Sequence, residues 1–274
     1  MSETRSSPRP FFVVSDVHGH LDELVEALRD AGLLSTDRVT WAGGDARLWF
    51  LGDYVDRGPD GVGVLNLVRR LGRQAPRSGG YVGALLGNHE LMLLAALHFP
   101  DAGPASSLYT YYDLWRFNGG RRRDLVRLND DHVAWLSGLP VMALVADHLL
   151  VHSDTTAYRE LGQDLDSVNA AVTGVLAGRD PVAWGDCLRI LLGRRAFRDP
   201  EAGPRAVREM LATFGGRWLV HGHTPVPDFL QCEPDAVTTA LQYAGGAAVA
   251  VDGGLPYGGP CLVVRLPLDD PDPA

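Results

Sequence analysis

The sequence contains no lysine, so all 25 of its basic residues are arginine, and its only isoleucine is Ile190. The codon bias of a GC-rich genome explains both features more simply than function does. The chain also lacks an excess of positive charge, because its formal net charge is −9. Nucleic-acid binding through a basic field is therefore disfavoured.

Paired cysteines and long hydrophobic runs are missing as well. Cys187, Cys232 and Cys261 are odd in number and widely separated, without a CxxC or CxxH pair. This pattern argues against a disulfide framework and a zinc knuckle, and it fits a reducing cytoplasm. No apolar run is long enough to cross a bilayer, and residues 1–10 lack the apolar segment of a signal peptide. We therefore expect a soluble cytoplasmic protein.

The length of 274 residues fits one large α/β domain, which we expect at residues 11–267. Residues 1–10 and 268–274 are polar and proline-containing, and we expect both to be disordered. At about 100–136 the strand pattern gives way to aromatic and arginine-rich stretches with helical spacing. This segment is predicted to be a helical insert.

Three successive segments share the order of apolar strand, polar loop and helix, with strands expected at 11–15, 48–51 and 82–86. Such alternation predicts a largely parallel sheet with helices on its faces and a ligand site at the carboxyl ends of the strands. The stretch at 41–45 is predicted to be the turn of a hairpin between two short strands.

A second sheet half is indicated further along the chain. Helices are expected at about 166–176 and 204–214. Strands are expected at 141–145, 149–151, 218–220, 247–251 and 262–266.

Five polar clusters each follow an apolar run: DVHG at 16–19, GDYVDRG at 52–58, GNHE at 87–90, HSD at 152–154 and HGHT at 221–224. A single histidine after a strand is more often structural than a metal ligand, but five clusters in sequence reverse that expectation. Asp, Asn and His from separate loops make a mixed oxygen and nitrogen shell that suits Mn, Fe or Zn better than Ca or Mg alone. Their number is about what two metal ions need.

These motifs, in this order, resemble the phosphoprotein phosphatase family of calcineurin-like metallophosphoesterases. The stretches WAGGDARLWFLGDYVDRG and LLGRRAF are more similar to its bacterial-type, Shewanella-like branch, and the resemblance extends from residue 11 to about 260. It implies an α/β sandwich of two mixed β-sheets flanked by helices. A dinuclear metal site would lie at the carboxyl ends of the strands.

The residues that the resemblance implies as metal ligands are Asp16, His18, Asp53, Asn88, His152 and His223. The first two would hold one ion, the last three the other, and Asp53 would bridge them. A carboxylate can bridge two cations about 3.5–4 Å apart because it offers two oxygens and reduces their repulsion. The ions implied are two divalent or mixed-valence metals, with Mn²⁺ favoured and Fe or Zn as alternatives.

The last cluster contains two histidines, His221 and His223, and only one is assigned as a ligand. His223 occupies the GH position of the motif, and Pro225 stands where the wider superfamily has a further histidine. His221 is interpreted as a structural residue or as a partner of the ligands.

The resemblance also implies which residues handle the substrate. Arg57 would bind phosphoryl oxygens as a bidentate fork, and Arg194 is the closest match to a second phosphate-binding arginine, with Arg195 as its competitor. His89 resembles the general acid of the family, and Asp56 resembles the carboxylate that orients it.

Several other residues stay open on sequence grounds. Asp154 adds a carboxylate of unknown role beside His152, and Asp252 is interpreted as structural. Arg121, Arg122 and Arg123 could attract an acidic phosphopeptide, although a solvated helix face is favoured. A cap over the cleft or a small core of the insert would account equally well for Tyr109, Tyr111, Tyr112 and Trp115.

The expected activity is hydrolysis of a phosphate monoester, on a phosphorylated peptide (Ser/Thr or Tyr) or a small phosphoester, by a metal-bridging hydroxide. One alternative is a dinucleoside polyphosphate hydrolase of the Ap4A type. An alternative of another class is a catalytically inactive phosphate-binding or scaffold protein. The complete set of expected ligands argues against that last possibility.

Overall fold

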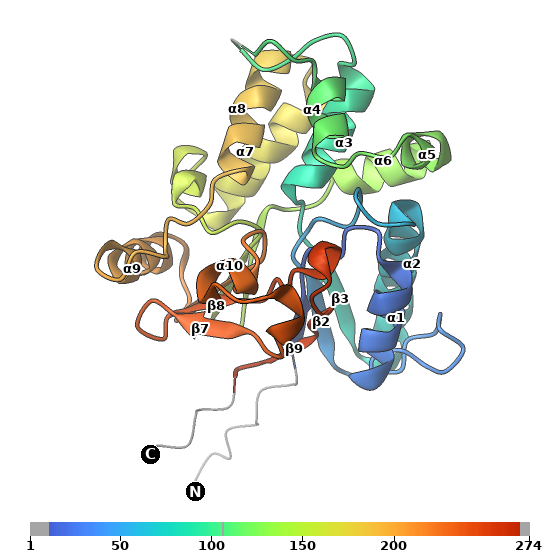
Figure 1. Cartoon of the computed structure of the whole chain (residues 1–274), viewed down its shortest axis with the longest axis vertical. Coiled ribbons are helices and arrows are strands. Elements are labelled where there is room, and N and C mark those ends of the chain that lie inside the picture. Colours follow the sequence, from blue (N-terminus) through green and yellow to red (C-terminus); the bar gives the residue numbers. More distant parts are fainter. Residues whose placement is uncertain (1–10, 106, 269–274) are drawn as a thin grey trace, which may run out of the picture.

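The computed structural model describes residues 11–105 and 107–268, which form two mixed β-sheets flanked by helices (Figure 1). The four-stranded sheet has the order β3-β2-β1-β9, and the five-stranded sheet has the order β4-β5-β6-β8-β7. The predicted fold class is confirmed. No helix within these described ranges is long and apolar enough to span a bilayer.

The first sheet is formed mainly by the β-loop-α units expected near the N-terminus. Its strands are β1 (Phe11–Val14), β2 (Arg47–Phe50), β3 (Tyr81–Ala84) and β9 (Val264–Leu266). The first three are parallel, and β9 is antiparallel to β1. The helices that follow β1 and β2 are α1 (Leu21–Asp30) and α2 (Gly61–Gln74).

The second sheet combines parallel central strands with antiparallel edges. Its strands are β4 (Met142–Val145), β5 (His148–Val151), β6 (Trp218–His221), β7 (Leu241–Tyr243) and β8 (Ala248–Ala250). β5, β6 and β8 are parallel, whereas β4 and β7 pair antiparallel with their neighbours. The parallel arrangement predicted from the three N-terminal units is found in β1 to β3 of the first sheet. In the second sheet only the central strands are parallel, because short turns at the edges can join only antiparallel strands.

The remaining helices follow the strands or lie between the two sheet halves. They are α3 (Asn88–His98), α4 (Tyr111–Phe117), α5 (Arg122–Arg127), α6 (Asp130–Ser137), α7 (Leu165–Ala177), α8 (Pro181–Leu191), α9 (Ala202–Phe214) and α10 (Val226–Leu230). Short 3₁₀ turns occur at Ala75–Ser78, Ala157–Glu160, Pro234–Ala236 and Leu255–Tyr257. Figure 1 shows α3, α4, α7 and α8 grouped at one end of the molecule, above the sheets.

The predicted hairpin around residues 41–45 does not form. Trp41 makes one antiparallel bridge with Leu34, and the turn at 44–45 leads directly into β2. Asp37 explains the difference, because its carboxylate accepts backbone N–H groups of Val39 and Thr40 at 3.0 and 2.9 Å. The segment between the two bridging residues is closed as a loop beyond the hydrogen bond from Ser35 N–H to the carbonyl of Thr40 at 2.9 Å.

Three short helices, α4 to α6, occupy most of the segment expected as a helical insert. Its aromatic residues divide into two groups. Tyr111 and Trp115 are buried, whereas Tyr109 is 52% exposed. Of the predicted disordered termini, residues 1–10 and 269–274 lie outside the described residues, and Leu268 is partly buried against the core between the sheets.

The core has two layers that follow from the alternation of side chains along the strands. On β1, Val13 belongs to an apolar cluster that also takes residues from strands of both sheets, while Val14 belongs to a larger cluster with the helices. Each sheet is therefore buried on both faces. The apolar cluster shared by the two sheets holds the strand ends together, so the loops that follow the strands lie next to one another.

Candidate metal centre

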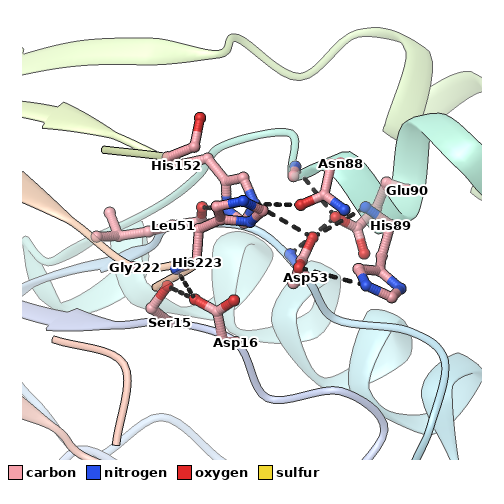
Figure 2. A network of polar contacts seen from close by, with 12 residues as sticks. Ser15, Asp16, Leu51, Asp53, Asn88, His89, Glu90, His152, Gly222 and His223 are labelled. Atoms are coloured by element: carbon pink, nitrogen blue, oxygen red, sulfur yellow. Dashed lines mark hydrogen bonds and ion pairs between the residues drawn. The ribbon is translucent and has the colours of Figure 1, made fainter. Parts of the chain in front are cut away.

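The polar clusters at the ends of β1, β2, β5 and β6 and at the start of α3 meet in one buried site (Figure 2). Asn88 is the first residue of α3, and His152 directly follows β5. All six sequence-predicted ligand residues are buried: Asp16, His18, Asp53, Asn88, His152 and His223. The structure thus brings together side chains that lie far apart in the chain.

The donor atoms form two adjacent groups that share Asp53. One group contains Asp16, Asp53, His152 and His223, and the other contains His18, Asp53 and His89. The two oxygens of Asp53 face different groups: Oδ1 lies 3.4 Å from His152 Nε2, and Oδ2 lies 3.6 Å from His18 Nε2. This arrangement is consistent with a dinuclear metal site with Asp53 at its centre.

Backbone carbonyls set the orientation of two of the histidines. His18 donates from Nδ1 to the carbonyl of Val55 at 3.0 Å, and His152 donates from Nδ1 to that of Leu51 at 2.8 Å. Each Nε2 therefore carries the lone pair and faces the carboxylates, as expected of a metal-binding imidazole. The amide oxygen of Asn88 lies 2.9 Å from His152 Nε2 and completes this side of the site.

The backbone at the site is strained. Positive φ angles, which residues other than glycine rarely adopt, occur at Asp16 (51°), His18 (46°), Asp53 (57°), Asp56 (70°), Arg57 (59°) and His223 (65°). Such conformations cost roughly 1–2 kcal/mol per residue and persist only where the surrounding structure over-determines them. Because six strained residues lie together here, the surrounding structure must hold the site in this conformation.

Glu90 is a site residue that sequence reasoning missed. It is fully buried, and its carboxylate accepts backbone N–H groups of Asp53 at 2.8 Å, Tyr54 at 2.7 Å and Gly87 at 3.1 Å. It thereby holds the loop after β2 against the start of α3. Its place at the third position of the helix, where a glutamate commonly accepts the N–H of the N-cap residue, was the available sequence signal.

The electrostatics of the donor set fit bound cations. Burial raises the pKa of Asp53 well above its ordinary value, and the carboxylates of Asp16 and Glu90 add to the shift. Burial also lowers the pKa of His18 well below its ordinary value, and the nearby charges of His89 and Arg57 lower it further. Cations placed between these groups would favour an ionised Asp53 and a neutral His18, which are the metal-binding forms.

His89, a member of the second donor group, forms a buried pair with Asp56. His89 Nδ1 lies 2.7 Å from Asp56 Oδ2, and His89 Nε2 lies 3.9 Å from Asp53 Oδ2. Burial raises the pKa of Asp56 to about 8 and lowers the pKa of His89 well below its ordinary value. The distance from His89 Nε2 to Asp53 shows that this nitrogen could contact a group bound at the two donor clusters.

The structure separates the two competing arginines. Arg194 NH2 lies 3.1 Å from His223 Nε2 in the site, whereas Arg195 donates to the carboxylate of Asp228 at 3.1 Å. On the other side, Arg57 NH2 lies 3.1 Å from His89 Nε2. Arg57 and Arg194 are thus the arginines that accompany the buried histidines.

Asp154 connects loops and is absent from both donor groups. Its Oδ1 accepts the hydroxyl of Thr224 at 2.6 Å, and its Oδ2 accepts the backbone N–H of Arg195 at 2.7 Å. It ties the loop that carries Arg194 to the loop after β6.

His221 and Asp252 are also engaged elsewhere. His221 Nε2 lies 2.6 Å from the hydroxyl of Tyr243, and Asp252 accepts the backbone N–H of Gly254 at 2.8 Å. Neither residue belongs to the two donor groups.

Residues 9–227 match the family described as calcineurin-like phosphoesterase. This match covers most of the chain, and the buried His/Asp site is intact. The protein belongs to the calcineurin-like phosphoesterase family.

Relatives in sequence include two kinds of enzyme. Shewanella-like protein phosphatase 2 of Arabidopsis thaliana is 38% identical over 86 residues, which is 31% of this chain and 22% of the relative. The symmetrical bis(5'-nucleosyl)-tetraphosphatase of Aromatoleum aromaticum is 28% identical over 195 residues, which is 65% of this chain and 60% of the relative. The chain thus spans less than two thirds of the length of these curated relatives.

Solved structures with a similar fold also fall into these two groups. The cold-active protein-tyrosine phosphatase of a psychrophilic Shewanella species superposes with a TM-score of 0.70 at 23% identity, covering 97% of this chain and 77% of that one. A putative diadenosine tetraphosphatase superposes with a TM-score of 0.50 at 16% identity, covering 97% of this chain and 96% of that one. The chain is a metallophosphoesterase related to protein phosphatases and to Ap4A hydrolases.

Proposed function

We propose that this protein hydrolyses phosphate monoesters, with phosphorylated Ser/Thr or Tyr in a peptide as the preferred substrate class. The observation that carries the proposal is the buried His89–Asp56 pair at 2.7 Å, next to Arg57. An alkoxide such as that of serine is a poor leaving group that needs a proton, whereas a phosphate leaving from an anhydride departs readily as an anion. A positioned acid is therefore most useful for a monoester.

The metal ions would be held by the six buried ligands named above, with Asp53 between them. The resemblance assigns Asp16 and His18 to one ion and Asn88, His152 and His223 to the other, with Asp53 shared. The donor atoms in the structure instead group Asp16 with His152 and His223, and His18 with His89, and Asp53 belongs to both groups. When bound, they would supply Lewis-acid stabilisation of phosphoryl oxygens and an activated water at neutral pH. Mn²⁺ suits this oxygen and nitrogen donor set, and Fe or Zn would suit it as well.

Arg57 and Arg194 would bind the phosphoryl group from two sides. Arg57 lies beside His89 and Arg194 beside His223, each at 3.1 Å, so a phosphoryl group at the donor clusters would lie between them. Each guanidinium could then exchange its histidine contact for a bidentate contact with phosphoryl oxygens. Such contacts neutralise charge on the equatorial oxygens during in-line displacement.

His89 would act as the general acid. Its Nδ1 is engaged with Asp56, and its Nε2 is the nitrogen directed toward Asp53 and Arg57. In the protonated imidazole, Nε2–H would donate its proton to the oxygen of the departing alcohol as the P–O bond breaks. Asp56 would keep the ring aligned through Nδ1 and, in its ionised form, would stabilise the imidazolium before the transfer.

A second candidate function is hydrolysis of dinucleoside polyphosphates. It is favoured by the 28% identity to a symmetrical bis(5'-nucleosyl)-tetraphosphatase over 65% of this chain. The metal ligands and arginines would serve both reactions. The difference lies in how strongly each substrate depends on the acid pair.

A substrate panel tests the proposal. The protein would be stripped with a chelator, reloaded with Mn²⁺, and assayed on phosphoserine and phosphotyrosine peptides, mononucleotides and diadenosine tetraphosphate. Turnover of phosphopeptides with little cleavage of diadenosine tetraphosphate is expected, and the converse would favour the second candidate. Absence of all turnover by protein with two bound metal ions would contradict both and indicate a phosphate-binding protein.

A further inference from the structure

The loop that carries Asp56 and Arg57 is covered by a segment about sixty residues further along the chain. This covering segment, residues 115–127, runs from the middle of α4 to the end of α5. The loop itself, residues 56–60, connects the end of β2 with α2. In Figure 1, α5 lies beyond the end of α2, and the two helices are in contact.

Two contacts join the covering segment to the residues with chemical roles. The indole N–H of Trp115 donates to Asp56 Oδ1 at 2.7 Å, and the backbone N–H of Arg57 donates to the carbonyl of Gly119 at 2.9 Å. Trp115 and Asp56 are both fully buried, so solvent water does not reach Asp56 to replace the indole as its hydrogen-bond donor.

Arginines of the segment hold the rest of the loop. Arg121 donates to the carbonyl of Arg57, Arg123 donates to that of Gly58 at 3.2 Å, and Arg127 pairs with Asp60 at 2.5 Å. The arginine-rich stretch was interpreted from sequence as a solvated helix face or an attractor of acidic peptides. All three consecutive arginines are exposed, as expected of a solvated face, and two of them, 121 and 123, also donate to backbone carbonyls of the loop.

The loop needs this support because its backbone is strained. Asp56 and Arg57 both have positive φ, at 70° and 59°. Gly119 permits the close approach, because its φ is +95° and a Cβ atom there would lie 2.7 Å from Arg57 Cγ. The covering segment therefore fits the strained conformation closely.

We propose that Trp115 is a positioning residue for the acid pair: its indole N–H fixes the Asp56 carboxylate so that Oδ2 faces His89 Nδ1. The inference rests on the proposed function, since it assigns a residue that supports the acid. The two Asp56 oxygens have one side-chain donor each, Trp115 and His89. Because the terminal torsion of an aspartate is soft, losing one donor leaves the carboxylate free to turn away from the imidazole.

The kinetic test uses Trp115→Phe, which keeps a buried aromatic ring but removes the indole N–H together with part of the bicyclic ring. Losing a hydrogen bond to a charged acceptor corresponds to a loss of roughly tenfold or more. We expect kcat for a phosphoserine peptide to fall by about that factor, and kcat for p-nitrophenyl phosphate to fall less than about threefold. KM for both substrates should change little, because Arg57 remains.

Trp184→Phe is the matched control. Trp184 is also buried, in the same helical end of the molecule, but its indole donates to the carbonyl of Gly178 at 3.3 Å. Any loss in this variant should be equal for the two substrates. The proposal is overturned if Trp115→Phe also affects both substrates equally.

A second measurement needs no turnover and no folded Trp115 variant. In a proton NMR spectrum recorded at pH 9, above the raised pKa of Asp56, the Trp115 indole N–H should move upfield in Asp56→Asn, because the charged acceptor becomes neutral, while the Trp184 resonance stays in place. An unchanged Trp115 resonance would overturn the proposal. A protein that shows this shift but hydrolyses no substrate in the panel would instead contradict the proposed function.

Discussion

The metal-ligand clusters and the acid loop at residues 56–60 lie side by side but are built in different ways. The ligands lie at or just after the ends of adjacent strands and at the start of α3, so the sheets themselves bring them together. The acid loop contacts Trp115 on α4 and Gly119 in the turn between α4 and α5, both outside the sheets. Under the proposed function, metal binding would thus depend on the sheet ends, whereas protonation of the leaving group would depend on the covering segment.

The largest expected effect comes from breaking the metal region at its centre. Asp53→Asn should abolish activity on every substrate and lower the metal content, because removing the shared negative charge leaves two cations to repel each other. Metal analysis after dialysis, with turnover measured in parallel, checks this. Asp45→Asn, an exposed position outside the site, is the control. Retention of both ions with near wild-type turnover would exclude a bridging role for Asp53.

Breaking the acid region should give a substrate-dependent loss. His89→Asn should reduce the rate on phosphoserine by about 10²–10⁴-fold and the rate on p-nitrophenyl phosphate far less, since nitrophenolate leaves without a proton. Asp56→Asn should follow the same trend more mildly, because the imidazole remains but is badly oriented.

Rates across a series of alkyl and aryl phosphates, with metal content measured in each variant, check the roles of His89 and Asp56. If His89→Asn loses the same factor on all of them while both metals stay bound, His89 is not the acid.

Arg57 tests the comparison between the metal-ligand clusters and the acid loop, because it lies on the acid loop but would bind phosphate. Arg57→Lys should be nearly as damaging as Arg57→Ala, with kcat/KM reduced by roughly 10²-fold, since a point charge cannot replace the planar fork. The loss should be similar for alkyl and aryl phosphates, in contrast to His89→Asn. Steady-state kinetics on both substrate types test it, and full activity of the lysine variant would show that charge alone suffices.

The smallest expected effect separates the two neighbouring arginines. Arg194→Ala should lower kcat/KM by roughly tenfold, corresponding to one lost charge-assisted contact. Arg195→Ala should change it less than about twofold, because Arg195 forms an exposed ion pair with Asp228, and such pairs contribute little. Inhibition by inorganic phosphate offers a direct measure of binding. A larger loss in the Arg195 variant would reverse the assignment.

The sequence alone determined the fold class and the candidate ligands. Apolar runs ending in Asp, His or Asn are local features, and the parallel strands of an α/β sheet necessarily bring such ends to one edge. That is why the five polar clusters could be proposed as a metal site before any coordinates. The resemblance then supplied the six individual ligands.

Only the tertiary structure decided how these groups face one another. Periodicity contains no information about which oxygen of Asp53 faces which histidine, or that Arg194 rather than Arg195 turns toward the site. Glu90 accepts from Asp53 and Tyr54, and Trp115 donates to Asp56, so both act on residues more than thirty positions away. Such bonds depend on how loops and helices pack in three dimensions. A local pattern could indicate the place of Glu90 at the start of a helix but not its partners after β2.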